Sequence, residues 1–331
     1  MASAQMTGDT AQRPGAQALA GSHGRARDWA EIQERMLVPL YQSVYQRLEV
    51  GAATSLLALG CRSGLALLLA AERGAQVTGE EDVAELRELA QGRGLAVSPG
   101  PAASAAGLEP AAAGFEPSPP GSEPSRAAGS AARFAPSVLD SAARFAPPAL
   151  DSAARFSPSP AGVAARSAYG VARPAHSLVT VFEQLPLAER PTELVAAAAR
   201  RTLPGGQVVL ASWGPPERCE SASVLAVAHR HAPRPPARGP FGLSAPGAME
   251  RLLNGAGLRP AGSGRVSCPF AYADLDEAVR GMLSTGLFER AVADAGEALV
   301  AKELEEALHP YVQADGSVRM VNLFRYVVAE R

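Results

Sequence analysis

The residues from Leu59 to Asp82 have the types and spacing that most clearly suggest chemistry. Glycines follow one apolar run there, and acids follow another. An apolar run ending at Leu59 is followed by the turn 60–64, which has glycine at both ends, and a second short run ends in Glu81 and Asp82. Glycines allow a backbone to turn sharply and to approach a ligand closely. The order of strand, glycine turn, helix, strand and acid predicts a nucleotide pocket. Arg62 is unexpected inside this turn, where such a loop favours another glycine.

The flanking sequence supplies the elements that must position this turn. Apolar runs bounded by glycine, proline and polar residues predict strands, and longer amphipathic runs predict helices. The predicted strands are 56–59, 75–79, SLVTVFEQL from 177, QVVLASW from 207, a strand before 272 and the closing SVRMVNLFRYVVAE. The predicted helices are about 63–73, 82–91, a helix capped by Thr192 and ended by Pro204-Gly205-Gly206, 245–257 and most of 274–312. This alternation predicts an α/β fold with a doubly wound, mostly parallel sheet, whose final strand is antiparallel, at an edge or inserted.

Two helices are expected ahead of the first strand. Residues 28–50 place apolar side chains at helical spacing, with Asp28 as the predicted N-cap. Pro39 is expected to divide this stretch into two helices. Residues 1–27 have the composition of a loose, disordered tail and lack the apolar core of a signal peptide. The first half of the domain therefore covers 28–96.

A change in composition separates the two halves of the domain. Residues 97–175 are rich in Ala, Pro, Ser and Gly, and order resumes over 176–331. Residues 130–162 contain three copies of an eleven-residue unit that begins SAARF. Each unit has one Phe and too little apolar surface for a packed repeat, which predicts a low-complexity, disordered insertion. A second interpretation is an array that presents three Arg-Phe pairs to a protein partner.

The composition excludes several classes of function. The chain has 331 residues, 47% of them hydrophobic, and a net charge of −2, so it can bury a large core and carries no electrostatic footprint for nucleic acid. Its most apolar segment, 55–71, contains an arginine and is shorter than a membrane span of about 20 residues. Cys61, Cys219 and Cys268 are too far apart for a zinc motif or a disulfide framework. We therefore expect a cytoplasmic protein without a metal, a nucleic-acid partner or a membrane partner.

Four stretches of the sequence together resemble one known family. They are LLALGCRSGLALLLAAERGAQVTGEED, RRTLPGGQVVLASWG, LLNGAGL and DGSVRMVNLFRYVVA. They are similar to the Rossmann-like S-adenosylmethionine-dependent methyltransferases of the bacterial small-molecule type, over 28–91 and 177–331. The resemblance implies a Rossmann-like fold, S-adenosylmethionine as cofactor and methyl transfer to a small organic acceptor. The segment 215–246 and the helices within 274–311 would form a cap that selects the acceptor.

The resemblance also implies which residues hold the cofactor. Glu81 matches the family's acid that accepts hydrogen bonds from both ribose hydroxyls, and Asp82 would lie near the adenine edge. The turn would surround the methionine part. The implied cofactor-binding residues are Gly60, Cys61, Arg62, Ser63, Gly64, Glu81 and Asp82. No residue is assigned a catalytic role, because many methyl transfers need mainly proximity and in-line orientation.

Three positions depart from the family pattern. Ala58 and Ser177 stand where the family has acids, and Arg62 stands where it has glycine. The charge of Arg62 either disfavours the positive sulfonium or pairs with the carboxylate of the cofactor. These departures leave an alternative function, a catalytically inactive methyltransferase-like binding or scaffold protein. A nicotinamide-dependent oxidoreductase is disfavoured, because Leu65 occupies the place of the third glycine in GxGxxG.

Other residues have both a functional and a structural interpretation. His229 or His231 could act as a general base, although both also fit a solvated loop. Tyr41 and Tyr45 could close over the methionine end of the cofactor or form the core face of a helix. The remaining candidates are Trp213 as a substrate wall or packing residue, Asp274 and Asp276 as helix caps, and Asn322, which has no assigned mechanism.

Overall fold

The computed structural model of the chain describes residues 24–100, 175–230 and 239–331. All of these residues belong to one compact unit. The repeats at 130–162 and the candidate base His231 lie outside the described residues. Within the described part of the chain, no helix is both long enough and apolar enough to cross a membrane.

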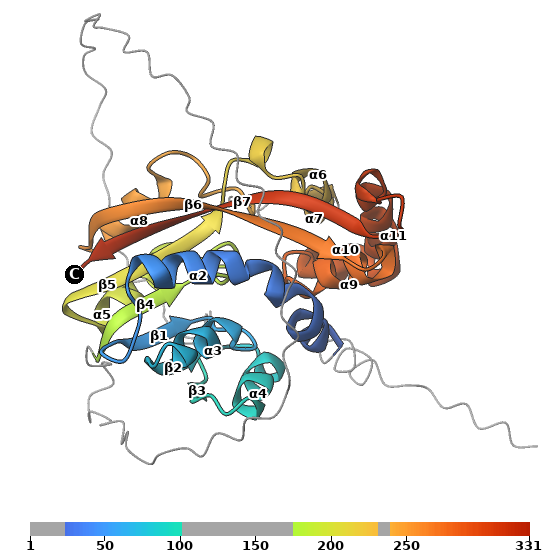
Figure 1. The fold of residues 1–331 in the computed structure, drawn as a ribbon. Helices are drawn as coiled ribbons and strands as arrows, with labels where there is room; N and C mark the ends of the chain where they lie inside the picture. Colours follow the sequence, from blue (N-terminus) through green and yellow to red (C-terminus); the bar gives the residue numbers. More distant parts are fainter. Residues whose placement is uncertain (1–23, 101–174, 231–238) are drawn as a thin grey trace, which may run out of the picture. The chain divides into compact units, whose positions relative to one another are not determined.

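The described strands form one seven-stranded sheet with the order β3-β2-β1-β4-β5-β7-β6. The strands are β1 (Ser55–Leu59), β2 (Gln76–Glu80), β3 (Val97–Ser98), β4 (His176–Val181), β5 (Thr202–Trp213), β6 (Arg259–Tyr272) and β7 (Val318–Glu330). Strands β1 to β5 pair in parallel, whereas β7 pairs antiparallel with both β5 and β6. This arrangement confirms the predicted doubly wound, mostly parallel sheet, with the antiparallel final strand inserted between two others (Figure 1).

Helices fill the connections between strands. The α-helices are α2 (Val38–Arg47), α3 (Leu65–Glu72), α4 (Ala84–Gly92), α5 (Pro191–Arg201), α6 (Ala222–Leu225), α7 (Val227–Arg230), α8 (Ala248–Gly255), α9 (Leu275–Ser284), α10 (Glu289–Ala295) and α11 (Glu297–Leu308). Shorter helical turns are η1 (Trp29–Gln33), η2 (Glu34–Leu37), η3 (Pro216–Arg218) and η4 (His309–Tyr311). Figure 1 shows α6, α7, α9, α10 and α11 gathered beside one end of the long β6–β7 pair, and we call this group the helical cap.

The central strands are apolar on both faces, and two hydrophobic cores result. In β1, Leu56 and Ala58 belong to the core that includes α2, α3 and the helical cap. Leu57 and Leu59 belong to the other core, which includes α5 and α8. A sheet that is buried on both faces requires such continuous apolar runs.

Strand β2 has one apolar and one polar face. Val77 packs against the first core. Gln76, Thr78 and Glu80 point to the opposite face, because side chains alternate along a strand, and they are exposed or half-buried. Glu80 pairs there with Arg201 at the end of α5, with 2.9 Å between Oε1 and Nε. The polar face of β2 therefore needs no apolar cover.

The boundaries of α5 differ from the prediction. Thr192 lies in the first turn of the helix and is not its cap. Pro191 is the first helical residue, a position that suits the fixed φ and missing N–H of proline. The 204–206 turn, predicted to end the helix, lies inside β5, because the backbone is already extended at Thr202 with φ −81° and ψ 136°.

The N-terminal helices confirm one expectation and correct another. Pro39 lies in the first turn of α2, so the chain does divide near this proline. Asp28, predicted as an N-cap, makes no capping hydrogen bond. Residues 24–28 are already helical, so Asp28 is not at a helix start. Its carboxylate instead pairs with Arg280 of α9 at 3.0 Å.

The order of strands places a topological switch point between β1 and β4. From β1 the chain continues outward through β2 and β3, and it then returns to the other side of β1 as β4. In open α/β sheets, ligands bind in the crevice outside the carboxyl ends of the strands at such a point. The turn 60–64, Glu81 and the segment 182–187 follow β1, β2 and β4 respectively, so all three lie at this edge.

Candidate functional site

The backbone of the turn after β1 depends on its two glycines. Gly60 has a φ of 66° and Gly64 a φ of 89°, in the left-handed region that glycine adopts without a steric cost. A Cβ atom at Gly60 would lie 2.4 Å from the side chain of Gln184. The first glycine therefore allows the segment after β4 to pack directly on the turn.

Cys61 and Ser63 of the turn face the interior. Burial raises the pKa of the Cys61 thiol. A Cβ atom at Gly79 would lie 2.7 Å from its Sγ, so β2 requires a glycine here. The Ser63 hydroxyl donates to the buried carboxylate of Glu34, and Arg93 donates to the same carboxylate at 2.6 Å. These contacts fix the turn to η2 and to the end of α4.

The side chain of Arg62 contacts the N-terminal helical segment and the end of α9. Arg62 is 5% exposed and has a φ of 52°, which is unusual for a residue other than glycine. Its Nη2 donates to the carbonyl oxygens of Ser284 at 2.9 Å and Thr285 at 3.1 Å, at the end of α9. Its guanidinium carbon lies 4.3 Å from the ring centre of Trp29. Arg62 thus joins the turn to the helical cap, and burial lowers its pKa.

Glu81 points at the turn, but it is only 1% exposed and lines neither of the two cavities described below, although the resemblance implies that it holds the ribose of a cofactor. Its carboxylate accepts hydrogen bonds from the backbone N–H of Arg62 at 2.7 Å and of Val83 at 3.0 Å. Burial raises the pKa of Glu81, and the charge of Arg62 and the two N–H groups oppose this effect. Its neighbour Asp82 is exposed.

A cavity of about 220 Å³ lies at the carboxyl ends of β1 and β2, and we call it the crevice. Two of the predicted residues, Gly60 and Asp82, line it, together with Gly100 after β3 and Gln184 after β4. The other lining residues are Leu59, Glu80, Leu187, Ala188, Glu189, Arg190, Glu193, Leu194, Ala197 and Arg200. The crevice thus lies at the switch point, where a doubly wound sheet binds its ligand.

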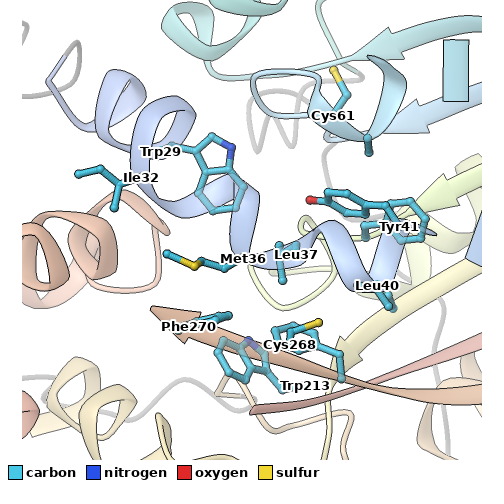
Figure 2. Close-up of a cluster of buried hydrophobic side chains, with 14 of the residues drawn as sticks. Trp29, Ile32, Met36, Leu37, Leu40, Tyr41, Cys61, Trp213, Cys268 and Phe270 are labelled. Carbon is cyan, nitrogen blue, oxygen red and sulfur yellow. The ribbon is translucent and has the colours of Figure 1, made fainter. Parts of the chain in front are cut away.

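A second cavity, of about 40 Å³, lies between the N-terminal helices and the strands β5 to β7, and we call it the aromatic cavity. Its lining is Trp29, Gln33, Leu37, Leu40, Phe182, Glu183, Pro186, Leu187, Trp213, Phe270, Thr285, Leu287 and Phe324. Figure 2 shows Trp29 and Tyr41 between the loop that carries Cys61 on one side and Trp213 with Phe270 on the other. Trp213 also packs on Phe324 at 4.5 Å between ring centres, so it is both a wall and a packing residue.

Glu183 is a candidate that our sequence reasoning missed. Its carboxylate accepts a hydrogen bond from the buried hydroxyl of Tyr41. Burial raises the pKa of Glu183 to about 7, while the Tyr41 hydrogen bond opposes this shift. Glu183 lines the aromatic cavity and the next residue, Gln184, lines the crevice. An acid soon after a buried strand at the switch point, like Glu81 after β2, was the available signal.

Ser177 and Ala58, the two positions where the resemblance would place acids, lie in different surroundings. Ser177 lies at the amino end of β4, where its hydroxyl accepts from the backbone N–H of Ser55 at 3.0 Å. The crevice lies at the opposite edge of the sheet, so the absence of an acid at Ser177 removes no group from it. Ala58 is buried in the first core, two residues before Gly60.

Several other sequence candidates have structural roles. His229 is half-buried in α7 and lines neither cavity. Tyr45 is buried, and its hydroxyl donates to the carbonyl of Ala66 at 2.9 Å. Asp274 accepts from the backbone N–H of Glu277 at 2.8 Å, which confirms it as the cap of α9.

Asn322 and Asp276 also contact neither cavity. The buried amide oxygen of Asn322 accepts from the backbone N–H of Ser221 at 3.0 Å. Asp276 pairs with Arg280 one turn further along α9 at 3.1 Å, so it is a surface residue of the helix and not its cap. Among the described residues, no group of three or more His, Cys, Asp or Glu side chains is placed to hold a metal ion.

Among known proteins, similarity is found to solved structures. No family model matches the chain, and no curated protein matches it. The similar structures include the Escherichia coli protein YjhP, with 13% identity over 94% of this chain and 99% of that chain and a TM-score of 0.47. An S-adenosylmethionine-dependent methyltransferase from Geobacter sulfurreducens, in complex with S-adenosylhomocysteine, has 12% identity over 91% and 92% and a TM-score of 0.44. The [4+2]-cyclase SpnF has 14% identity over 88% and 80% and a TM-score of 0.43.

Proposed function

We propose that this chain binds S-adenosylmethionine in the crevice and transfers its methyl group to a small organic acceptor. The observation that carries this proposal is the place of the crevice, at the switch point of a doubly wound sheet, against the glycine turn. The cofactor supplies a methyl group on a positively charged sulfur. The acceptor would come from the side of the aromatic cavity, because Glu183 and Gln184, which are consecutive in the chain, line one cavity each, and this cavity of about 40 Å³ would have to widen to admit it.

The charge of the crevice favours this cofactor over a dinucleotide. Its lining contains the carboxylates of Glu80, Asp82, Glu189 and Glu193 and the guanidinium groups of Arg190 and Arg200. Arg190 pairs with Glu193, and Arg201 beside the crevice pairs with Glu80, so the excess is one negative charge. A lining with excess negative charge attracts a cationic ligand and repels the pyrophosphate of a nicotinamide dinucleotide. This argument agrees with the missing third glycine of the dinucleotide motif at Leu65.

The crevice fits the adenosine part of the cofactor better than the whole of it. Ligand pockets for molecules of this size have volumes of about 300–1,000 Å³, whereas the crevice has about 220 Å³. Gly60 and Asp82 would hold the adenosine part, since they line the crevice. Glu81 would reach the ribose only after a small opening, because it is buried in the present state.

One observation favours a second function, that of a ligand-binding protein without methyl transfer. Arg62 fills the space between the turn, Trp29 and the end of α9, beside the methionine-binding turn that the resemblance implies. If Arg62 never withdraws, a complete cofactor does not fit. A protein of this second kind would still bind adenosine in the crevice.

Isothermal titration with S-adenosylmethionine separates these functions. We expect heat of binding, and competition by S-adenosylhomocysteine but not by oxidised nicotinamide dinucleotide. Asp82→Arg should weaken binding about tenfold or more by reversing a charge of the crevice. Glu305→Arg, on an exposed position of α11, is the matched control and should bind like the unaltered chain. Binding of adenosine alone would favour the second function, and no binding by either the unaltered chain or Arg62→Ala would reject the first.

A further inference from the structure

The guanidinium of Arg62 lies in a cation site that other parts of the chain have built. The face of the Trp29 ring is on one side, with its centre 4.3 Å from the guanidinium carbon. The carbonyl oxygens of Ser284 and Thr285 accept its hydrogen bonds at 2.9 and 3.1 Å. Aromatic faces and helix carboxyl ends both carry negative potential, so both attract a cation.

The surroundings of this site add further negative charge. The carboxylates of Glu81, Glu183 and Glu289 act on Arg62 from the end of β2, the end of β4 and the start of α10 respectively. These three carboxylates belong to segments other than the turn that carries Arg62. The site would therefore keep its attraction for a cation in the absence of Arg62.

Arg62 does not satisfy this site completely. Its buried Nε has no hydrogen-bond partner. Its backbone has a φ of 52°, a conformation that costs a side-chain-bearing residue more than it costs glycine. The buried Nε without a partner lowers the cost of withdrawing this side chain, whereas the backbone conformation is the same in both positions.

Arg62 lines neither cavity, but it lies close to residues of both. Its backbone is two residues from Gly60 of the crevice, and its guanidinium contacts Trp29 and Thr285 of the aromatic cavity. Leu187, which lines both cavities, and Arg62 Nη1 both lie near Gly286, at 3.6 and 3.7 Å from the position of a Cβ atom there. Withdrawal of the side chain would free space at the boundary between the cavities.

We propose that Arg62 is a built-in plug, whose guanidinium fills a cation site that the positively charged end of an incoming ligand occupies when the side chain withdraws. The ligand class is a sulfonium or an ammonium. Its identification with the cationic end of S-adenosylmethionine rests on the proposed function, whereas the existence of the cation site does not.

The cation site is tested without any cofactor by chemical rescue of Arg62→Ala. Methylguanidinium chloride at about 50 mM should raise the unfolding midpoint of this variant by about 2 °C or more, because a ligand that binds only the folded state stabilises it. The unaltered chain, whose site is filled, should show no such rise. Methylurea, which is neutral, and sodium chloride at equal ionic strength are the matched additives. Equal effects of methylguanidinium and methylurea, or no rise in the variant, would overturn the proposal.

Competition with the cofactor tests the role of the plug. Arg62→Ala should bind S-adenosylmethionine about tenfold or more tightly than the unaltered chain, the equivalent of one charge-assisted hydrogen bond that no longer has to be broken. Methylguanidinium should weaken this gain. If methylguanidinium rescues the variant but no cofactor binds, the cation site stands and the proposed function fails. If both chains bind the cofactor equally and methylguanidinium has no effect, the plug fails and the proposed function stands.

Discussion

At the scale of single residues, the backbone and the side chain of Arg62 have different roles. The backbone N–H of Arg62 holds Glu81 at 2.7 Å, an interaction that any residue except proline supplies. The guanidinium acts elsewhere, at Trp29 and the end of α9. Replacing the side chain should therefore change space and charge beside the crevice and leave Glu81 anchored.

Glu183 provides a pH prediction at the same scale. Its pKa rises from 4.5 in the unfolded chain to about 7 in the folded protein, so the folded state binds more protons between these values. Stability from this group is then present at low pH and lost as pH rises through this window. Glu183→Gln should be more stable than the unaltered chain by about 1–3 kcal/mol at pH 8 and show no gain at pH 4.5. Urea unfolding of both chains at pH 8 and pH 4.5 measures the difference in their free energy of unfolding. The same difference at both pH values would contradict the prediction.

At the scale of elements, the turn 60–64 is anchored to η2 by a hydrogen bond. Glu34 is 4% exposed and accepts hydrogen bonds from Ser63 of the turn and from Arg93 after α4. One carboxylate thus connects three segments that are distant in sequence. The position of the turn depends on this contact as well as on its glycines.

Glu34→Gln should lower the free energy of unfolding by about 1–3 kcal/mol, because it leaves the partly buried charge of Arg93 without its counter-charge. The control is Glu31→Gln, which removes an exposed pair with Arg27 and should cost no more than about 0.5 kcal/mol. Denaturant unfolding of the two variants compares them. A similar loss in both would mean that the Glu34 contacts contribute nothing specific.

The elements that were predictable from sequence are those with strong local patterns. The strand β1, the glycine turn and α3 follow from LLALGCRSGLALLLAA, and Gly60 and Asp82 do line the crevice. The end of α5 was not predictable, because Thr202 already pairs with His176 of β4, a contact distant in sequence, and residues 203–206 bulge out of this pairing. The burial of Glu81 and the pairing of Glu183 with Tyr41 likewise depend on tertiary contacts that one sequence does not show.

At the scale of the whole molecule, one sheet is formed by two stretches that the low-complexity segment separates. Strands β1 and β4, from the two sides of that segment, pair directly in parallel. All described residues belong to one compact unit, and the polar face of β2 needs no apolar cover. The described fold should therefore be complete without residues 104–160.

Replacing 104–160 by a short Gly-Ser linker tests this. We expect the unfolding midpoint and the affinity for S-adenosylhomocysteine to be unchanged, since every described residue that lines the crevice remains. Thermal unfolding and titration are the measurements, with a chain carrying the same linker inserted after Asp315, in the exposed turn before β7, as control for the linker. Loss of affinity at an unchanged midpoint would assign part of the ligand site to the removed segment.

A crystal structure of the chain grown with S-adenosylhomocysteine tests the central claim most directly. We predict adenosine in the crevice between Asp82 and Gln184, with the guanidinium of Arg62 moved from the carbonyl oxygens of Ser284 and Thr285. A structure in which the crevice contains no ligand at saturating concentration, or in which the whole cofactor product lies in it while Arg62 keeps both hydrogen bonds, would contradict the account.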